Sequence, residues 1–121
     1  MNVYQQQAEL FRALAHPVRL RILDILSWQE ACVCHLTAVL RKRQPYVSQQ
    51  LSMLRDAGLV TDRREGTLIY YRLRDERIAE LLTVGRHAVP GEESLSGGRP
   101  DVPDRPVPGC PCPRCQAGGD S

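Results

Sequence analysis

Apolar residues recur at helical spacing through the first forty residues of the chain. A first helix is predicted over residues 3–15, because Leu10, Phe11 and Leu14 fall on one face. His16-Pro17 ends this helix and begins a second, since proline suits a first helical turn, and we interpret the histidine as a helix cap. The second helix is apolar over much of its circumference and is expected at the centre of the core. A third, brief helix is predicted up to residue 40.

A fourth helix is predicted over residues 44–58. Gln44-Pro45 opens this helix, and Gly58 closes it as a C-terminal cap. Its core-facing positions are Val47, Leu51 and Leu54. Polar side chains occupy the opposite face, so the helix is expected to lie at the surface with one side in the core.

A strand pattern follows the fourth helix. Residues 59–64 and 67–73 are rich in strand-forming side chains and flank Glu65-Gly66, which predicts a β-hairpin. Asp75 suits the N-cap of a last helix that reaches about residue 88. Four helices, a hairpin and a final helix indicate a mainly α domain. Two helices joined by a tight turn and followed by a two-stranded wing predict a winged helix-turn-helix.

The composition changes at residue 90. Seven of the nine prolines and six of the nine glycines lie in residues 90–121, where apolar periodicity is almost absent. Such a segment buries too little surface to offset the entropy of ordering, which predicts a disordered tail. The folded domain is therefore predicted over residues 1–89, a size at which dimerisation often supplies part of the stability.

Positive charge gathers in the second half of the predicted domain. Residues 41–74 hold eight Lys and Arg against three Asp and Glu, whereas residues 90–121 hold three against five. A basic stretch around one surface helix favours a polyanion partner, here double-stranded DNA. The α-helix that follows the tight turn fits the width of a major groove, and the hairpin can reach the adjacent minor groove or phosphates. The predicted DNA contacts are Tyr46, Ser48, Gln49, Ser52 and Arg55 on the helix, Arg41, Lys42 and Arg43 before it, and Arg63, Arg64 and Arg72 on the wing.

Two motifs resemble the ArsR/SmtB family of bacterial metal-sensing repressors. The first is Ala-Leu-Ala-His-Pro-Val-Arg-Leu-Arg-Ile-Leu at residues 13–23, and the second is Tyr-Val-Ser-Gln-Gln-Leu-Ser-Met-Leu-Arg-Asp-Ala-Gly-Leu-Val at residues 46–60. The similarity runs over about residues 8–88. It implies a homodimer formed through the first and last helices, which binds a palindromic operator and leaves it when an effector binds.

Cys32 and Cys34 are the candidate effector site. Paired thiolates are soft donors that select thiophilic ions over Mg²⁺ or Ca²⁺, and Cys-Val-Cys-His-Leu resembles the Cys-Val-Cys-Asp-Leu of arsenic- and cadmium-sensing family members. The predicted effector is As(III)/Sb(III) or Cd(II)/Pb(II). Residues i and i+2 lie about 200° apart on a regular helix, so one ion held by both sulfurs is expected to distort the start of the third helix. That helix supports the fourth.

The remaining ligands are left open by the sequence. Arsenic-sensing relatives often have a third cysteine where this chain has Thr37, and His35 replaces the usual Asp. Missing thiolates could come from the tail, whose cysteines are Cys110, Cys112 and Cys115. Three sulfurs suit As(III) or Pb(II), and four suit Cd(II) or Zn(II). The alternative for the tail is an appendage with no part in the site.

Other functions fit the sequence less well. The same thiols would suit a redox- or persulfide-sensing repressor, whereas a metal carrier or redox protein would leave the fourth helix unexplained. A winged helix that contacts only proteins would leave the basic flanks unexplained. No set of nucleophile, base and orienting residue is evident, so an enzyme is not expected. The chain shows no membrane-length apolar run and no signal peptide, so a cytoplasmic protein with reduced cysteines is expected.

Overall fold

The computed structural model describes residues 2–91 of the 121-residue chain. The predicted tail, apart from residues 90 and 91, lies outside the described residues. The elements follow the predicted order, with one strand that the sequence did not predict. They are α1 (Val3–Leu14), α2 (Pro17–Leu26), β1 (Ala31–Cys32), α3 (Val33–Leu40), α4 (Gln44–Asp56), β2 (Val60–Glu65), β3 (Leu68–Leu73) and α5 (Glu76–His87).

Side chains cap α1, α2 and α5 at the positions where the sequence breaks its apolar pattern. The Asn2 side chain accepts the N–H of Gln5, and the Gln5 side chain accepts the N–H of Asn2, a capping box on α1. His16 caps α2, because its Nδ1 accepts the backbone N–H of Val18 at 3.2 Å, which confirms the cap predicted there. Asp75 caps α5 in the same way through the N–H of Arg77, at 2.8 Å. These caps satisfy donors that a first helical turn leaves open.

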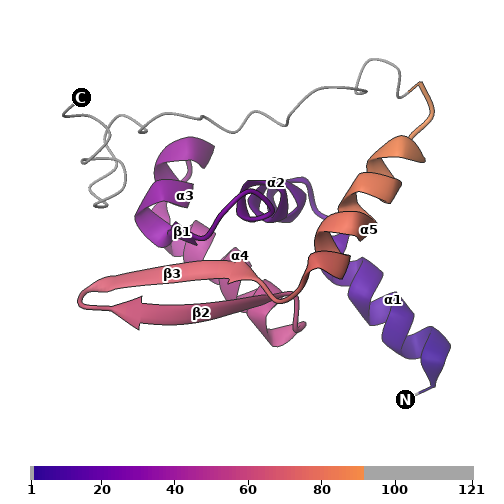
Figure 1. Cartoon of the computed structure of the whole chain (residues 1–121), viewed down its shortest axis with the longest axis horizontal. Helices are drawn as coiled ribbons and strands as arrows, with labels where there is room; N and C mark the ends of the chain where they lie inside the picture. Colours follow the sequence, from indigo (N-terminus) through magenta and orange to yellow (C-terminus); the bar gives the residue numbers. More distant parts are fainter. Residues whose placement is uncertain (1, 92–121) are drawn as a thin grey trace.

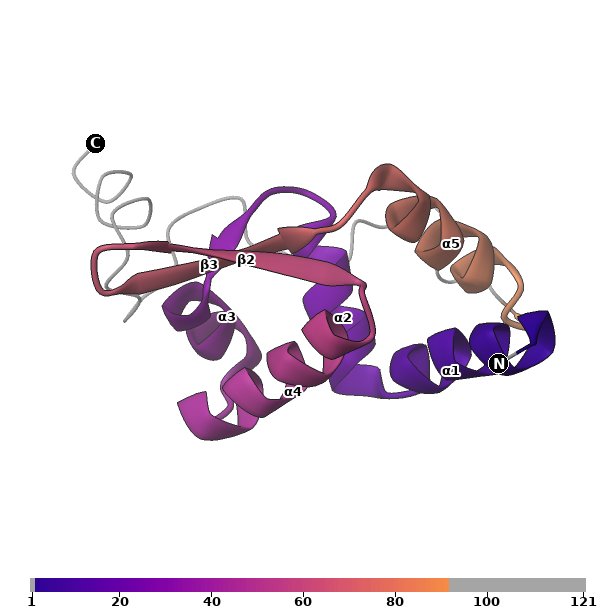
Figure 2. The same ribbon diagram turned by 90° about the horizontal axis from the view of Figure 1, so that it is seen from below.

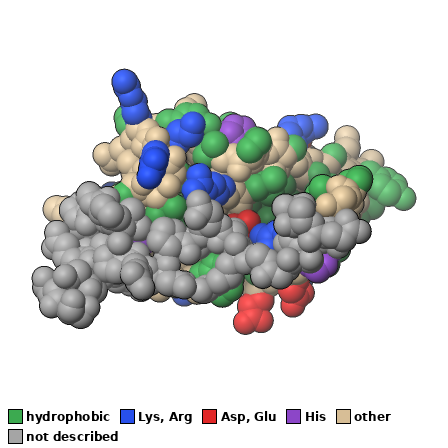
Figure 3. Space-filling model, turned by 90° about the horizontal axis from the view of Figure 1, so that it is seen from above, with side chains coloured by type: hydrophobic (Ala, Val, Ile, Leu, Met, Phe, Trp, Pro, Cys, Tyr) green, Lys and Arg blue, Asp and Glu red, His purple; other side chains and the backbone are tan. Residues whose placement is uncertain are grey.

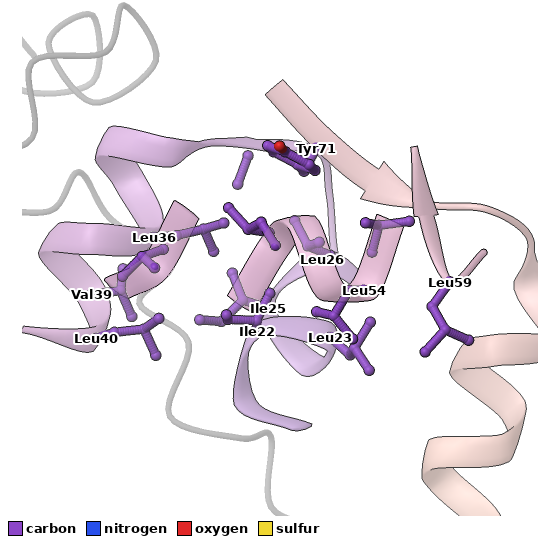
Figure 4. Packing of buried hydrophobic residues seen from close by; sticks show 14 of the residues in the cluster. Ile22, Leu23, Ile25, Leu26, Leu36, Val39, Leu40, Leu54, Leu59 and Tyr71 are labelled. Carbon is purple, nitrogen blue, oxygen red and sulfur yellow. The ribbon is translucent and has the colours of Figure 1, made fainter. Parts of the chain in front are cut away.

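The core is built around α2, as the sequence predicts. Ile22, Leu23 and Ile25 are almost completely buried, and side chains from α3, α4 and β3 surround them. Figure 4 shows these apolar groups converging from several elements, with Tyr71 of β3 at the sheet side. Burial of such side chains is worth roughly 1.5–3 kcal/mol each, so α2 is the main anchor of the domain.

The wing is one part of a three-stranded sheet. β2 and β3 form the predicted hairpin, and β1 adds to its other side in the order β1-β3-β2, all antiparallel. The hairpin turn contains Gly66, whose φ of +63° favours glycine. Because β1 ends at Cys32, α3 begins one residue later, at Val33.

The elements divide the molecule into two ends. α1 and α5 both lie at one end, and the β2–β3 hairpin extends toward the other (Figures 1 and 2). α4 packs against α2, α3 and β2, and it lies along the lower side of the hairpin in Figure 2. The turn between α3 and α4 is short and passes through Arg41, which adopts a left-handed conformation with φ +55°.

Candidate nucleic-acid interface and cysteine pair

α4 presents the polar face that the sequence predicts. Val47, Leu51 and Leu54 are fully buried against the core. The opposite face carries the predicted contacts, with Gln49 and Arg55 exposed and three others half-buried, namely Tyr46, Ser48 and Ser52. An amide and hydroxyls on the surface side of a helix are suited to base edges and phosphate oxygens. We call α4 the reading helix.

Gln50 is a polar residue on the core side of the reading helix. It is buried, and its side-chain oxygen has no hydrogen-bond partner among the described residues. A buried acceptor without a partner costs about 1–3 kcal/mol. Gln50 is therefore a local cost to stability and not a candidate DNA contact.

Basic side chains lie in the turn before the reading helix and on the wing. Arg41, Lys42 and Arg43 lie exposed in the turn before it, and Arg64 lies exposed on β2 near the hairpin turn. Within residues 2–91 none of these four forms an ion pair. Figure 3 shows Lys and Arg side chains mostly over the half of the molecule away from its apolar right-hand end. Their charge remains available to a polyanion.

Two other predicted contacts are already paired within the protein. Arg55 of the reading helix bonds Asp62 of β2 at 3.2 Å, which ties helix and wing together. Arg63 bonds Glu30 at 2.6 Å and Glu65 at 2.7 Å, and hydrogen bonds from these carboxylates raise the pKa of its guanidinium. Arg72 lies exposed across from Thr61, to which its Nε donates at 3.4 Å.

The cysteine pair lies where β1 ends and α3 begins. Cys32 has extended backbone angles (φ −80°, ψ 160°) and is the N-cap of α3, and Cys34 belongs to the first turn of that helix. Their sulfurs are joined in a disulfide, with Cα atoms 5.4 Å apart. The expectation that the sulfurs diverge is therefore wrong, because it placed both residues on one regular helix. Once the disulfide is reduced to two thiolates, sulfurs at these positions can hold one ion without unwinding α3.

The Cys32 sulfur is also part of the helix cap. It accepts the backbone N–H of His35 at 3.3 Å. Cys32 is buried, with 1% of its surface exposed, and Cys34 is half-buried. Because α3 packs against α4, a change of bonding at this sulfur acts on the helix that supports the reading helix.

A complete metal site does not form within the described part of the chain. Among residues 2–91, no group of three or more His, Cys, Asp or Glu side chains is placed to hold an ion. Thr37 does not supply a third sulfur, and its hydroxyl donates to the carbonyl of Val33 at 2.8 Å. The tail cysteines at positions 110, 112 and 115 lie outside the described residues.

An apolar groove lies between α1 and α5 at the end opposite the hairpin. It has a volume of about 460 Å³ and is lined by Phe11, Leu14, Leu20, Leu81, Leu82 and Val89 among others. Several large apolar side chains of α1, of α5 and of the residues just after α5 are exposed, namely Val3, Tyr4, Phe11, Val84 and Val89. An exposed apolar surface of this kind is typical of a protein–protein interface.

An ion pair forms part of the groove wall. Asp24 of α2 and Arg86 of α5 are 2.8 Å apart. Burial raises the pKa of Asp24, and the Arg86 charge opposes that shift without cancelling it. The pair joins the central helix to the last one.

None of the helices in residues 2–91 is long and apolar enough to span a membrane. The fold, the polar reading helix and its basic flanks define the class of protein as a winged helix-turn-helix DNA-binding regulator.

Comparison with known proteins gives the family. Residues 16–62 match the family described as "Bacterial regulatory protein, arsR family". The chain is 43% identical over 95 residues to the HTH-type transcriptional repressor SmtB of Mycobacterium tuberculosis. The matched region covers 78% of this chain and 69% of that protein. This chain belongs to the ArsR/SmtB family of transcriptional regulators.

Solved structures agree with this assignment. The crystal structure of M. tuberculosis Rv0081 matches with a TM-score of 0.67 and 40% identity, covering 72% of this chain and 88% of that one. The solution structure of the homodimeric winged helix-turn-helix domain Mb0332 of Mycobacterium bovis, a possible ArsR-family regulator, matches with a TM-score of 0.66 and 35% identity. That match covers 70% of this chain and 79% of that one.

Sequence reasoning missed two features of the site. β1 was not predicted, although Ala31 and Cys32 pair with Tyr71 and Tyr70 of β3. The partner of Arg63 was not predicted either, because Glu30 lies 33 residues away in the sequence. A carboxylate just before the cysteine pair was the only local signal.

Proposed function

We propose that this protein is a dimeric repressor that leaves its operator when a thiophilic ion, As(III)/Sb(III) or Cd(II)/Pb(II), binds Cys32 and Cys34. The observation that carries the proposal is the meeting of both sulfurs at the first turn of α3. One of these sulfurs is the cap of α3, and α3 packs against the reading helix. An ion that takes up the cap sulfur therefore changes the support of the helix that enters the groove.

The DNA contacts of the proposal are those on the exposed side of the reading helix and on its basic flanks. Ser48, Gln49 and Ser52 contact base edges and phosphates in the major groove. Arg41, Lys42, Arg43 and Arg64 contact phosphates, because they carry no internal ion pair within residues 2–91. Arg55 and Arg63 have carboxylate partners of their own, so we assign them to positioning the wing.

The dimer of the proposal forms through α1 and α5. These helices line the apolar groove and carry half of the exposed large apolar side chains of the described residues. A two-fold dimer places one reading helix in each half of a palindromic operator. The homodimeric Mb0332 domain has the same fold.

The ion needs more donors than the two sulfurs. Cys110, Cys112 and Cys115 are the thiols from which this chain would complete the set, from the same subunit or its partner. A pyramidal As(III) needs one of them, and a tetrahedral Cd(II) needs two. Their participation is the part of the proposal that a truncation tests directly.

A second candidate is a repressor that responds to oxidants or persulfides through the same pair. Two observations favour it: the sulfurs are bonded to each other, and the described residues offer no third ligand. Two thiols would lose two protons and two electrons to the oxidant and form the disulfide. The site is the same in both candidates, and only its chemistry differs.

The test is DNA binding followed by fluorescence anisotropy. The duplex is a palindrome selected by the protein from a random library. As(III), Cd(II), Pb(II) and Zn(II) are titrated in reductant, and diamide is titrated without it. Release by at least one thiophilic ion, lost in Cys32→Ser and Cys34→Ser, supports the first candidate. Release by diamide alone supports the second, and full responses in both variants would refute the site.

Truncation after residue 90 tests the tail. If the tail cysteines are ligands, the truncated protein requires at least about tenfold more ion for the same release, which corresponds to roughly 1.4 kcal/mol of lost binding. An unchanged response shows that the ligands come from elsewhere. Circular dichroism of the truncated protein is the control for folding.

A further inference from the structure

Glu30 links the segment that carries the cysteine pair to the far strand of the wing. Its carboxylate accepts two hydrogen bonds from Arg63, one from Nε at 2.8 Å and one from Nη2 at 2.6 Å. Two parallel charge-assisted bonds fix both distance and orientation. The Glu30 side chain is only 17% exposed, so water competes less for it than for a surface carboxylate.

The residues involved lie in one row across the sheet. Cys32 in β1 pairs with Tyr70 in β3, and Tyr70 pairs with Arg63 in β2. The Arg63 guanidinium lies over the Tyr70 ring, 4.6 Å from its centroid. Glu30 stands two residues before Cys32 and bonds Arg63, at the far end of this row. The Glu30–Arg63 bond therefore connects the cysteine segment to β2, across the whole sheet.

Arg63 has a second carboxylate that would keep it paired if Glu30 moved. Its Nη1 donates to Glu65 at 2.7 Å, within the same strand. If the bond to Glu30 opened, the Arg63 guanidinium would therefore still have the Glu65 carboxylate as an acceptor. β1 has only two residues, so few ladder bonds hold it to β3. These two features would favour a second arrangement of the sheet, in which the Glu30–Arg63 bond is open.

We propose that Glu30 is a positioning residue that transmits the state of the cysteine pair to the wing. The bond to Arg63 is closed when the two sulfurs are joined, as here, and it opens when Cys32 and Cys34 separate as thiols. The wing is then attached to the cysteine segment through β3 alone, and Arg64, the next residue of β2, moves with it. This inference rests on the proposed function, since that function supplies a reason for the pair to change its bonding.

The test compares hydrogen exchange of the wing in the two thiol states of the full chain. Diamide takes up the two protons and two electrons of the thiols as it is reduced to its hydrazine, and a reductant restores the thiols. In the unmodified protein, amides of residues 60–73 are expected to exchange about fivefold or more faster in the thiol state. In Glu30→Gln the ratio between the two states falls to within about twofold of one.

Glu65→Gln is the matched control. It removes a carboxylate that pairs with the same guanidinium, but Glu65 does not lie on the cysteine segment. The Arg63 side chain is 48% exposed, so water replaces Glu65 as an acceptor in the open arrangement, and the fivefold response is expected to persist. Each variant is compared with itself in two states, so a purely structural loss cancels. The Cys32→Ser/Cys34→Ser protein measures any contribution from the cysteines at positions 110, 112 and 115. If Glu30→Gln fails to fold, Arg63→Gln cuts the same bond from the other side.

DNA binding separates this inference from the proposed function. The ratio of operator affinities in the two thiol states is expected to fall toward one in Glu30→Gln and to persist in Glu65→Gln. If the unmodified protein shows no such ratio but its wing exchange still depends on Glu30, the inference stands and the proposed thiol response fails. An exchange response in Glu30→Gln equal to that of the unmodified protein overturns the inference, whatever the DNA binding.

Discussion

The charge of Arg64 gives the sharpest test of how the wing meets DNA. Arg64 is exposed and forms no ion pair within residues 2–91. Arg64 lies two residues after Asp62 on β2, and side chains two residues apart project from the same side of a strand. Asp62 bonds Arg55 of the reading helix, so Arg64 also projects from the side that faces α4. Arg64→Gln is therefore expected to remove one phosphate contact per subunit and two per dimer.

The magnitude follows from counterion release. Each phosphate contact contributes about 0.9 to the slope of log K against log salt concentration, so two contacts contribute about 1.8. Between about 50 and 200 mM salt the concentration rises about fourfold, and 0.6 × 1.8 gives about 1.1 in log K. The affinity advantage of the unmodified dimer over Arg64→Gln is thus expected to shrink about tenfold across that range.

The assay is anisotropy of a labelled operator duplex at several salt concentrations. The matched control is Arg77→Gln, which removes the same charge from an exposed position on α5, where Arg77 pairs with Asp75. Its slope is expected to equal that of the unmodified protein within about 0.5. An unchanged slope in Arg64→Gln, or an equal loss in both variants, would show that the wing does not contact phosphates in this way.

Three further predictions concern the fold and the dimer. Gly58→Ala is expected to lower the free energy of unfolding by about 1–3 kcal/mol in urea titrations, because φ is +78° and the added Cβ would lie 3.0 Å from Arg74 Nη1; an unchanged midpoint would contradict this. Val84→Glu is expected to convert the dimer to monomers in sedimentation at unchanged circular dichroism, since Val84 is 66% exposed on α5, a helix that lines the apolar groove, and a persisting dimer would place the interface elsewhere. Burial raises the pKa of Asp24 above 3.8. The Asp24 carboxyl is therefore protonated at a higher pH in the folded state than in the unfolded chain, so the contribution of Asp24 to the free energy of unfolding rises as the pH falls through the window just above 3.8. Asp24→Asn is expected to flatten the unfolding free energy in that window, and an unaltered pH profile would show that Asp24 does not control it.

The helices were predictable because each carries a local signal of its own. Proline and histidine at the start of α2, glycine after α4 and aspartate before α5 mark element ends through the chemistry of caps and left-handed turns. The apolar stripes of α2 and α4 predicted the buried residues for the same reason. The polar face of the reading helix was predictable for the same reason, because the buried positions of a helix determine which positions face the solvent.

The features that were not predictable depend on contacts between distant parts of the chain. A strand of two residues has no period, so β1 is visible only through its pairing with β3. That pairing makes the backbone at Cys32 extended, and this brings the sulfur toward Cys34. In the same way, the charge of Arg63 was visible in the sequence, whereas its neutralisation by Glu30 needs the sheet to be formed.

The connection between the reading helix and the wing has a consequence for how the protein would be regulated. The turn after α4 is closed by a backbone hydrogen bond from Leu59 to Leu54 at 2.9 Å, and Arg55 reaches Asp62. Helix and hairpin are therefore expected to move as one body, with the base-contacting and phosphate-contacting groups at fixed spacing. An effector that displaces this body weakens binding to strong and weak operators by a similar factor. The rank order of preferred DNA sequences would then stay the same while occupancy falls, so the signal would change the extent of repression and not the set of genes that is repressed.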